Sequence, residues 1–198
     1  GGGTETNGVN LLGRWSHQFA AGSDMVLQMY FDKTSLRFST PPLVVNNLPL
    51  ARAGVFEDVL ETYDIDFQHG IPIGARNRFV WGLAYRSTHD EISNAPSLAF
   101  FPEKLHQELY SAFVQDEISL VPDKLMLTLG SKFEHNDYTG WETIPSVRLQ
   151  YNIDQNQTLW AAVSRAVRAP SRIDCDLSQP VPLTPGNFVV LARGLNYV

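Results

Sequence analysis

The sequence has few of the residues that build catalytic or covalently stabilised sites. Cys175 is the only cysteine among 198 residues, which excludes an internal disulfide and a multi-cysteine zinc site. The chain has no GxSxG motif, no HExxH motif and no phosphate-binding glycine loop. We therefore expect no catalytic residues, no metal ligands and no cofactor, and we do not expect an enzyme.

Charge and long apolar runs are scarce as well. Charged residues make up 18% of the chain, against about 25% in a typical protein, and the net charge is −6. A nucleic-acid partner is therefore not expected, because phosphate-backbone binding needs clustered Lys and Arg. No run approaches the roughly 18 consecutive apolar residues of a transmembrane helix.

What the sequence has is an alternation of apolar and polar residues, repeated along the chain. In residues 62–68, for example, Ile65 and Phe67 alternate with Asp64 and Asp66. This period of two is typical of β-strands. We expect eight strands, at residues 9–19, 24–32, 62–68, 78–86, 110–118, 125–134, 146–151 and 158–164. Phe113, Asp116 and Trp160 break the alternation.

The lengths of the strands and links favour a membrane barrel. Five of the eight segments have nine to eleven residues. Soluble strands average about five or six, and membrane-spanning strands need roughly nine to eleven. Short links at 20–22, 70–76, 121–124 and 152–156 alternate with longer ones at 38–54, 89–104 and after 166, except for the brief link 137–140. Outer-membrane barrels have short turns on one side and long loops on the other. A soluble β-sandwich or lipocalin-like barrel alternates too, with its apolar face inward.

Four segments of the second half follow one another in the order SAFVQDEISL (111–120), LTLGSKFEHNDYTG (127–140), PSVRLQY (145–151) and TLWAAVSRAVRAPSR (158–172). In order and spacing they resemble the middle of TonB-dependent outer-membrane receptors. In the first half, ETYDIDFQHGIPIGARNRFVWGLAYR (61–86) is similar to barrel strands of the same receptors. The best-matching part is 106–174.

The resemblance implies an all-β fold, an antiparallel transmembrane β-barrel. Residues 1–198 would form a partial barrel domain that supplies about eight of its 22 or so strands, with the plug domain absent from this sequence. The implied function is transport across the outer membrane of a Gram-negative bacterium, most often uptake of a ferric siderophore or a similar scarce ligand. The implied partners are outer-membrane lipid, that ligand, and the TonB system acting through a plug that is not present here.

Two other functions stay open on the sequence. One is a small complete eight-stranded outer-membrane barrel that acts as an adhesin or structural anchor. The other is a soluble β-barrel that binds a small apolar ligand.

Three arginines gather where the last expected strand ends: Arg165, Arg168 and Arg172. Pro170 lies among them and marks the exit from the strand, because it has no N–H to donate to a sheet. One interpretation is structural, with the arginines pairing with acidic residues at the base of a loop, such as Glu142, Asp174 or Asp176. The other is ligand binding, in which the planar donor fork of each arginine attracts an anionic ferric chelate.

Two groups of residues invite assignment as a metal site. His89, Asp90 and Glu91 are consecutive, and we expect them in a solvated loop because no second spaced cluster completes a coordination shell. His106 and Glu108, two residues apart, are expected to share one face of a strand.

Overall fold

A computed structural model describes residues 3–45, 47–183 and 188–193 of the chain. Its main feature is an eight-stranded antiparallel sheet in the order β1-β2-β5-β6-β8-β9-β10-β11. These strands are β1 (Thr4–Gln18), β2 (Asp24–Thr40), β5 (Gly54–Ile73), β6 (Asn77–Ser93), β8 (Lys104–Val121), β9 (Leu125–Asn136), β10 (Gly140–Asn152) and β11 (Thr158–Ser164). Each strand pairs with the one that follows it in the sheet, so the predicted all-β class and all eight predicted strands are confirmed.

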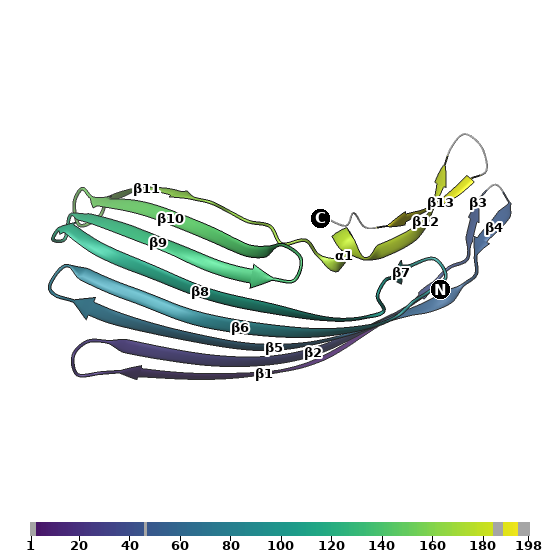
Figure 1. The fold of residues 1–198 in the computed structure, drawn as a ribbon, viewed down its shortest axis with the longest axis horizontal. Coiled ribbons are helices and arrows are strands. Elements are labelled where there is room, and N and C mark those ends of the chain that lie inside the picture. Colours follow the sequence, from purple (N-terminus) through teal and green to yellow (C-terminus); the bar gives the residue numbers. More distant parts are fainter. Residues whose placement is uncertain (1–2, 46, 184–187, 194–198) are drawn as a thin grey trace.

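Smaller elements interrupt the longer links. They are β3 (Leu43–Val45), β4 (Leu48–Ala51), β7 (Ala99–Phe100), α1 (Arg172–Cys175), β12 (Leu177–Leu183) and β13 (Phe188–Arg193). They lie on the side of the long links, as does the brief β9–β10 turn, and the short turns β1–β2, β5–β6, β8–β9 and β10–β11 lie at the other end (Figure 1). The described part of the chain contains no helix long and apolar enough to cross a membrane. The predicted separation of short turns from long links is confirmed.

The strands of the sheet extend beyond the segments predicted from alternation. β5 has 20 residues and β8 has 18, because the backbone ladder continues past the apolar stretch. In this extension, cross-strand ion pairs replace apolar pairs: Lys33–Glu61 at 2.7 Å, Arg37–Glu57 at 3.0 Å and Lys104–Glu91 at 2.5 Å. The expectation of a loop at residues 89–91 is therefore wrong, since these residues belong to β6.

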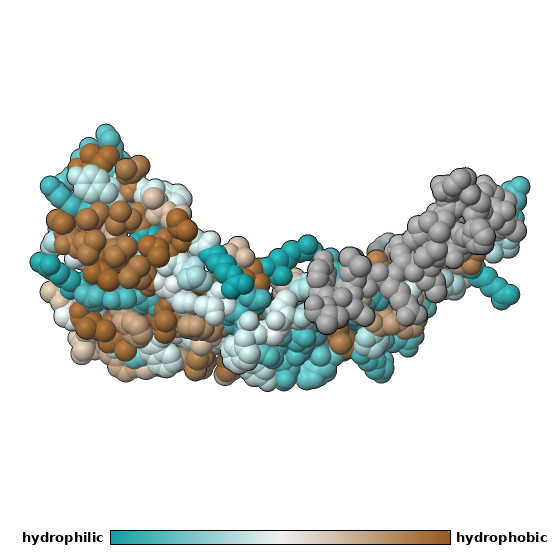
Figure 2. Space-filling view, turned by 45° about the horizontal axis from the view of Figure 1, so that its top comes forward, coloured by the Kyte–Doolittle hydropathy of each residue, from teal (hydrophilic) through white to brown (hydrophobic). Residues whose placement is uncertain are grey.

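Alternation gives the sheet two chemically different faces. In register across the sheet, Trp15, Leu27, Phe67, Leu83, Ala112 and Phe133 form one row of what we call the apolar face. Their neighbours along each strand, among them Gln28, Asp66, Ser111 and Glu134, lie on the polar face. Apolar residues gather at the end with the short turns, and hydrophilic residues predominate toward the other end (Figure 2).

The apolar face has no covering layer in the described residues. Leu83 keeps 52% of its surface exposed and Leu11 keeps 71%, and no large side chain of the residues that the structure describes is buried below 2% exposure. Contiguous apolar surface of this kind marks a contact with membrane or protein. A soluble β-barrel would instead turn this face inward, so the soluble alternative is not supported.

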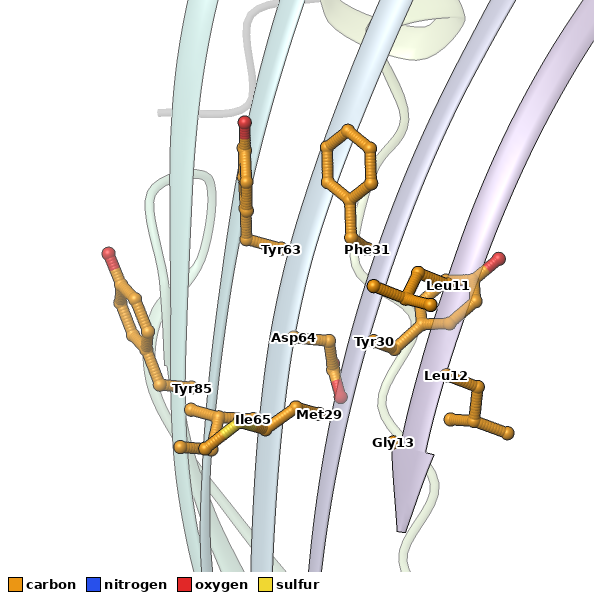
Figure 3. Close-up of a pocket in the computed structure, with 10 residues that line it drawn as sticks. All are labelled: Leu11, Leu12, Gly13, Met29, Tyr30, Phe31, Tyr63, Asp64, Ile65 and Tyr85. Atoms are coloured by element: carbon orange, nitrogen blue, oxygen red, sulfur yellow. The ribbon is translucent and has the colours of Figure 1, made fainter.

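A groove of about 460 Å³ runs along the apolar face near the strand β1 (Figure 3). Phe31 and Tyr63 lie side by side on neighbouring strands, with ring centroids 5.0 Å apart. Met29 and Ile65 lie next to them along the same strands. On the same face, the next residue pair along the two strands is the Lys33–Glu61 ion pair. The aromatic pair therefore marks the edge of the apolar region.

The two strand residues that break the predicted alternation on β8 have different physical explanations. Phe113 lies on the polar face opposite Gly82, whose missing side chain leaves room for the ring. Asp116 lies on the apolar face, where the Asn77 amide donates a 2.7 Å hydrogen bond to its carboxylate.

A small hydrophobic core lies at the end of the sheet with the long links. Phe56, Ile92, Ala95 and Phe100 are buried there, and Leu177 packs against them. β12 pairs with β7 at the same place, through Leu177 opposite Phe100. The segment that follows β11 is thereby tied to the link between β6 and β8.

Replacement of Gly82 by alanine should weaken the sheet. A Cβ at this position would lie 2.6 Å from the carbonyl oxygen of Phe67 and would collide with the Phe113 ring, whereas a Cβ at Gly13 meets nothing within 4 Å. We expect Gly82→Ala to destabilise the folded barrel by about 1–3 kcal/mol, as overpacking does, and Gly13→Ala to change it little. Urea unfolding of the full-length protein, followed by its heat-modifiable electrophoretic mobility, measures both. Equal effects of the two substitutions would contradict this packing.

Candidate functional site: an arginine strap on the polar face

Residues 165–178, here called the strap, leave the end of β11 and run to the link between β6 and β8. The strap begins with Arg165, whose backbone N–H donates to Pro145 O at 3.1 Å. The Arg165 guanidinium donates to the carboxylate of Glu142 at 2.8 Å and to Thr143 O at 2.7 Å. The first arginine therefore fixes the start of the strap to β10.

The middle of the strap lies against the polar face. Ala169 and Pro170 contribute one side of a gap of about 130 Å³. The other side is formed by residues of three strands and of the link between β9 and β10: Arg86, Thr88, Gln107, Glu108, Leu109, Asn136, Asp137 and Tyr138. The strap thus crosses from β11 over β9 and β8 to β6.

Arg168 is held by a short capping motif. Ser171 is the N-cap of α1, and its backbone N–H and hydroxyl each donate to the Asp174 carboxylate, at 2.8 and 2.9 Å. Arg168 donates to the same carboxylate at 2.9 Å, and its side chain remains 82% exposed. Hydrogen bonds from Ser171, and then the charge of Arg168, hold the pKa of Asp174 below its usual range.

Arg172 is the best-enclosed of the three arginines, with its side chain 10% exposed. It donates to the Asp90 carboxylate at 2.7 Å, to Asp176 at 3.1 Å and to Pro102 O. Its guanidinium carbon lies 5.6 Å from the centroid of the Phe100 ring, within the range of a cation–π contact. These contacts join α1 to β6 and to the link that contains β7.

Two further residues complete the surroundings of Arg172. The Tyr138 hydroxyl donates to Asp176 at 3.1 Å, and burial, reinforced by the charge of Asp176, raises the pKa of this hydroxyl. Burial followed by the charge of Asp90 raises the pKa of Asp58 to about 6. We call Arg172, Asp58, Asp90, Asp176 and Tyr138 the clasp.

The acidic partners suggested by the sequence are the ones that the structure brings to the arginines. Arg165 pairs with Glu142, Arg168 with Asp174, and Arg172 with Asp176. Each arginine therefore has an acidic partner of the kind that the structural interpretation expects. Ligand binding by the three stays a prediction, and their exposure differs: 53% for Arg165, 82% for Arg168 and 10% for Arg172.

Sequence reasoning missed the role of Asp90 and Tyr138 in this site. Asp90 lies 82 residues from Arg172 in the chain, and only the path of the strap brings them together. The sequence feature that indicates a role for Asp90 is its position on the polar side of β6, two residues after Thr88. His89, its neighbour, faces the other way and stacks on His106, with ring centroids 4.1 Å apart.

His106 and Glu108 share the apolar side of β8, as predicted, but their partners differ. His106 Nε2 lies 2.9 Å from the Ser87 hydroxyl, and Glu108 accepts a 2.7 Å hydrogen bond from the Tyr85 hydroxyl. Cys175 lies in α1, where burial raises the pKa of its thiol.

Loss of the Arg172 side chain should open the strap. Arg172→Gln leaves Asp90 and Asp176 enclosed without their cation, and breaking such an enclosed pair removes about 3–5 kcal/mol. We expect amide hydrogen exchange in residues 165–178 of the full-length protein to rise accordingly. Arg168→Gln is the control, since an exposed ion pair contributes less than about 1 kcal/mol. Equal protection in the two variants would show that Arg172 does not hold the strap.

The sequence matches one protein family over most of its length and one known receptor over a shorter segment. Residues 1–187 match the family described as "TonB dependent receptor-like, beta-barrel". The ferric enterobactin receptor of Pseudomonas aeruginosa is 36% identical over 63 residues, which are 32% of this chain and 8% of that receptor.

Solved structures show the same fold. The siderophore receptor PirA from Acinetobacter baumannii superposes with a TM-score of 0.71 at 18% identity, over 96% of this chain and 30% of that one. A mutant of the ferric enterobactin receptor PfeA from Pseudomonas aeruginosa gives a TM-score of 0.62 at 20% identity, over 83% and 26%. The chain thus spans less than a third of the length of these receptors.

The eight strands form an open sheet in the described residues, since β1 and β11 each have one neighbour, so they are not a closed eight-stranded barrel. Together with the match over most of the sequence, this arrangement gives the identity of the chain: it belongs to the TonB-dependent receptor β-barrel family and provides eight consecutive strands of such a barrel wall.

Proposed function

We propose that the chain is part of the wall of an outer-membrane receptor that takes up a ferric siderophore. The observation that carries this proposal is the division of one continuous sheet into an apolar face and a polar face, with an arginine-bearing strap on the polar face. The apolar face would contact lipid, and the polar face would line the lumen. The end with the long links would lie outside the cell.

The height of the apolar region fits a membrane. On β5 it extends from the ion pair at Glu61 to Ile73, next to a short turn. Twelve residues at about 3.4 Å each, tilted by about 40°, rise roughly 30 Å, which is enough for the apolar band of about 25 Å in outer-membrane barrels. The remaining residues of β5 would stand above the bilayer, and the clasp residues Asp58 and Asp90 lie in that part of β5 and β6.

Arg165 and Arg168 are the arginines available to an anionic chelate. Both keep more than half of their side-chain surface exposed, so donors remain free to reorient toward a ligand. Guanidinium groups suit multidentate oxygen ligands because they offer several donors in one plane. Arg172 would act through the strap, by holding Arg168 in place, rather than by touching the ligand.

Energy for uptake would come from the TonB system. Coupling to that system would use a plug domain inside the barrel. Ferric enterobactin, the ligand in the name of the similar Pseudomonas aeruginosa receptor, is the natural first candidate among ferric siderophores. No catalytic step is part of this function.

The test is ligand binding by the full-length receptor and its arginine variants. Purified receptor is titrated with ferric enterobactin and with a panel of other ferric siderophores, and quenching of tryptophan fluorescence reports the Kd. We expect one of these chelates to bind, and Arg165→Gln/Arg168→Gln to weaken it about tenfold, equivalent to about 1.4 kcal/mol.

Arg37→Gln is the matched control, because Arg37 also pairs with a carboxylate but lies on the apolar face. Its Kd should equal that of the unsubstituted receptor. Failure of the whole panel to bind would overturn siderophore uptake. Tight binding with no effect of the double substitution would leave uptake standing and remove the arginines from the site.

A further inference from the structure

The clasp contains two carboxyl groups that face each other without enough donors. Asp58 Oδ1 and Asp90 Oδ1 are both buried and have no hydrogen-bond partner. Arg172 satisfies the other oxygen of Asp90, and its remaining hydrogen bonds go to Asp176 and to Pro102 O rather than to Asp58. A buried acceptor without a donor costs folding free energy, so these two oxygens require an additional hydrogen-bond donor.

A proton can supply that hydrogen. If one carboxyl group carries it, its O–H donates to the other carboxylate, and the like charges that both groups would otherwise have are reduced to one. Shared protons are the usual solution when two carboxyl groups occupy one site. The raised pKa of Asp58, about 6 against an ordinary 3.8, is caused first by burial and then by Asp90, and it agrees with this geometry.

The other charged groups around the pair do not replace the proton. Across from Asp58, β2 presents Leu36 and β6 presents Ile92, neither of which is charged. The strap contributes the cation Arg172, and that guanidinium is already shared with Asp90 and Asp176. Two titratable groups lie beside Asp176 rather than beside the pair: Tyr138, which donates to Asp176, and Cys175.

We propose that the Asp58–Asp90 pair makes the clasp an acid-tightened latch: a shared proton closes the strap onto the polar face, and its loss loosens the strap. The closed state buries both carboxyl groups under Arg172 and α1, and the open state returns them to water. The latch itself does not depend on a ligand. Its consequence for access of a chelate to the lumen rests on the proposed function.

The direction of the pH effect follows from proton linkage. The closed state binds the proton more tightly than the open state, in which Asp58 returns to its ordinary pKa. Closure therefore gains stability as the pH falls from about 6 toward 3.8, and that gain is lost as the pH rises through about 6. Between pH 8 and pH 5 the ratio of closed to open strap should rise about tenfold.

The test measures the position of the strap in the full-length receptor in lipid nanodiscs, without ligand. Two spin labels are attached in a background that lacks other cysteines, including Cys175→Ser. One label is at Ile173→Cys on the exposed side of the strap, and the other is at Asn156→Cys in the turn between β10 and β11. Double electron–electron resonance gives the distribution of distances between them from pH 5 to pH 8.

We expect one narrow distance at pH 5. A second, broader population of distances should grow as the pH rises, with a midpoint near pH 6. Asp58→Asn should keep the narrow distance at both pH values, because its amide donates permanently to Asp90. Asp66→Asn, on the same face of β5 but outside the clasp, should titrate like the unsubstituted receptor.

Two results would overturn the latch. One is a distance distribution in the unsubstituted receptor that does not change with pH or that changes with a midpoint near 4. The other is an Asp58→Asn variant that titrates as the unsubstituted receptor does. If Asp58→Asn fails to insert, the midpoint of the unsubstituted receptor decides alone.

Discussion

The pairing of backbone N–H and C=O groups between neighbouring strands is the interaction on which the rest of this structure depends. It forms an antiparallel ladder in which each strand of the sheet pairs with the next one in chain order, from β1 to β11, and a sheet placed in hydrocarbon would require such pairing of every backbone group. Short turns suffice to reverse the chain at one end, and the longer links are confined to the other. The two edges of the described sheet have their own unpaired backbone groups, which further strands of a closed barrel would satisfy.

The same ladder explains why a simple alternation has functional meaning. A strand shows its odd and even residues to opposite sides, so one register decides the chemistry of both faces. On β6 this puts Leu83 on the apolar face and Arg86 on the polar face, where Arg86 pairs with Asp64. The side that suits lipid and the side that suits an aqueous lumen are therefore consequences of one pattern.

The fold was largely predictable from the sequence, because alternation is a local property. Alternation correctly located the strand at residues 62–68, but it did not show that β5 begins at Gly54. The backbone pairing continues past the point where polar and apolar residues stop alternating. The partners of the arginines were partly predictable: Asp174 and Asp176 are close in sequence, and Glu142 lies on the neighbouring strand. Asp90 was not, because a contact across 82 residues depends on the path of the strap.

Labelling along β6 distinguishes residues that face lipid from residues that face the lumen, which should alternate along each strand. Single cysteines from Phe79 to Thr88 in the full-length receptor are labelled with a fluorophore, and the receptor is placed in bilayers that contain nitroxide-bearing lipids. We expect strong quenching at odd-numbered positions such as Leu83 and weak quenching at even-numbered ones such as Ala84. Quenching without a two-residue period, or with the opposite phase, would contradict this alternation.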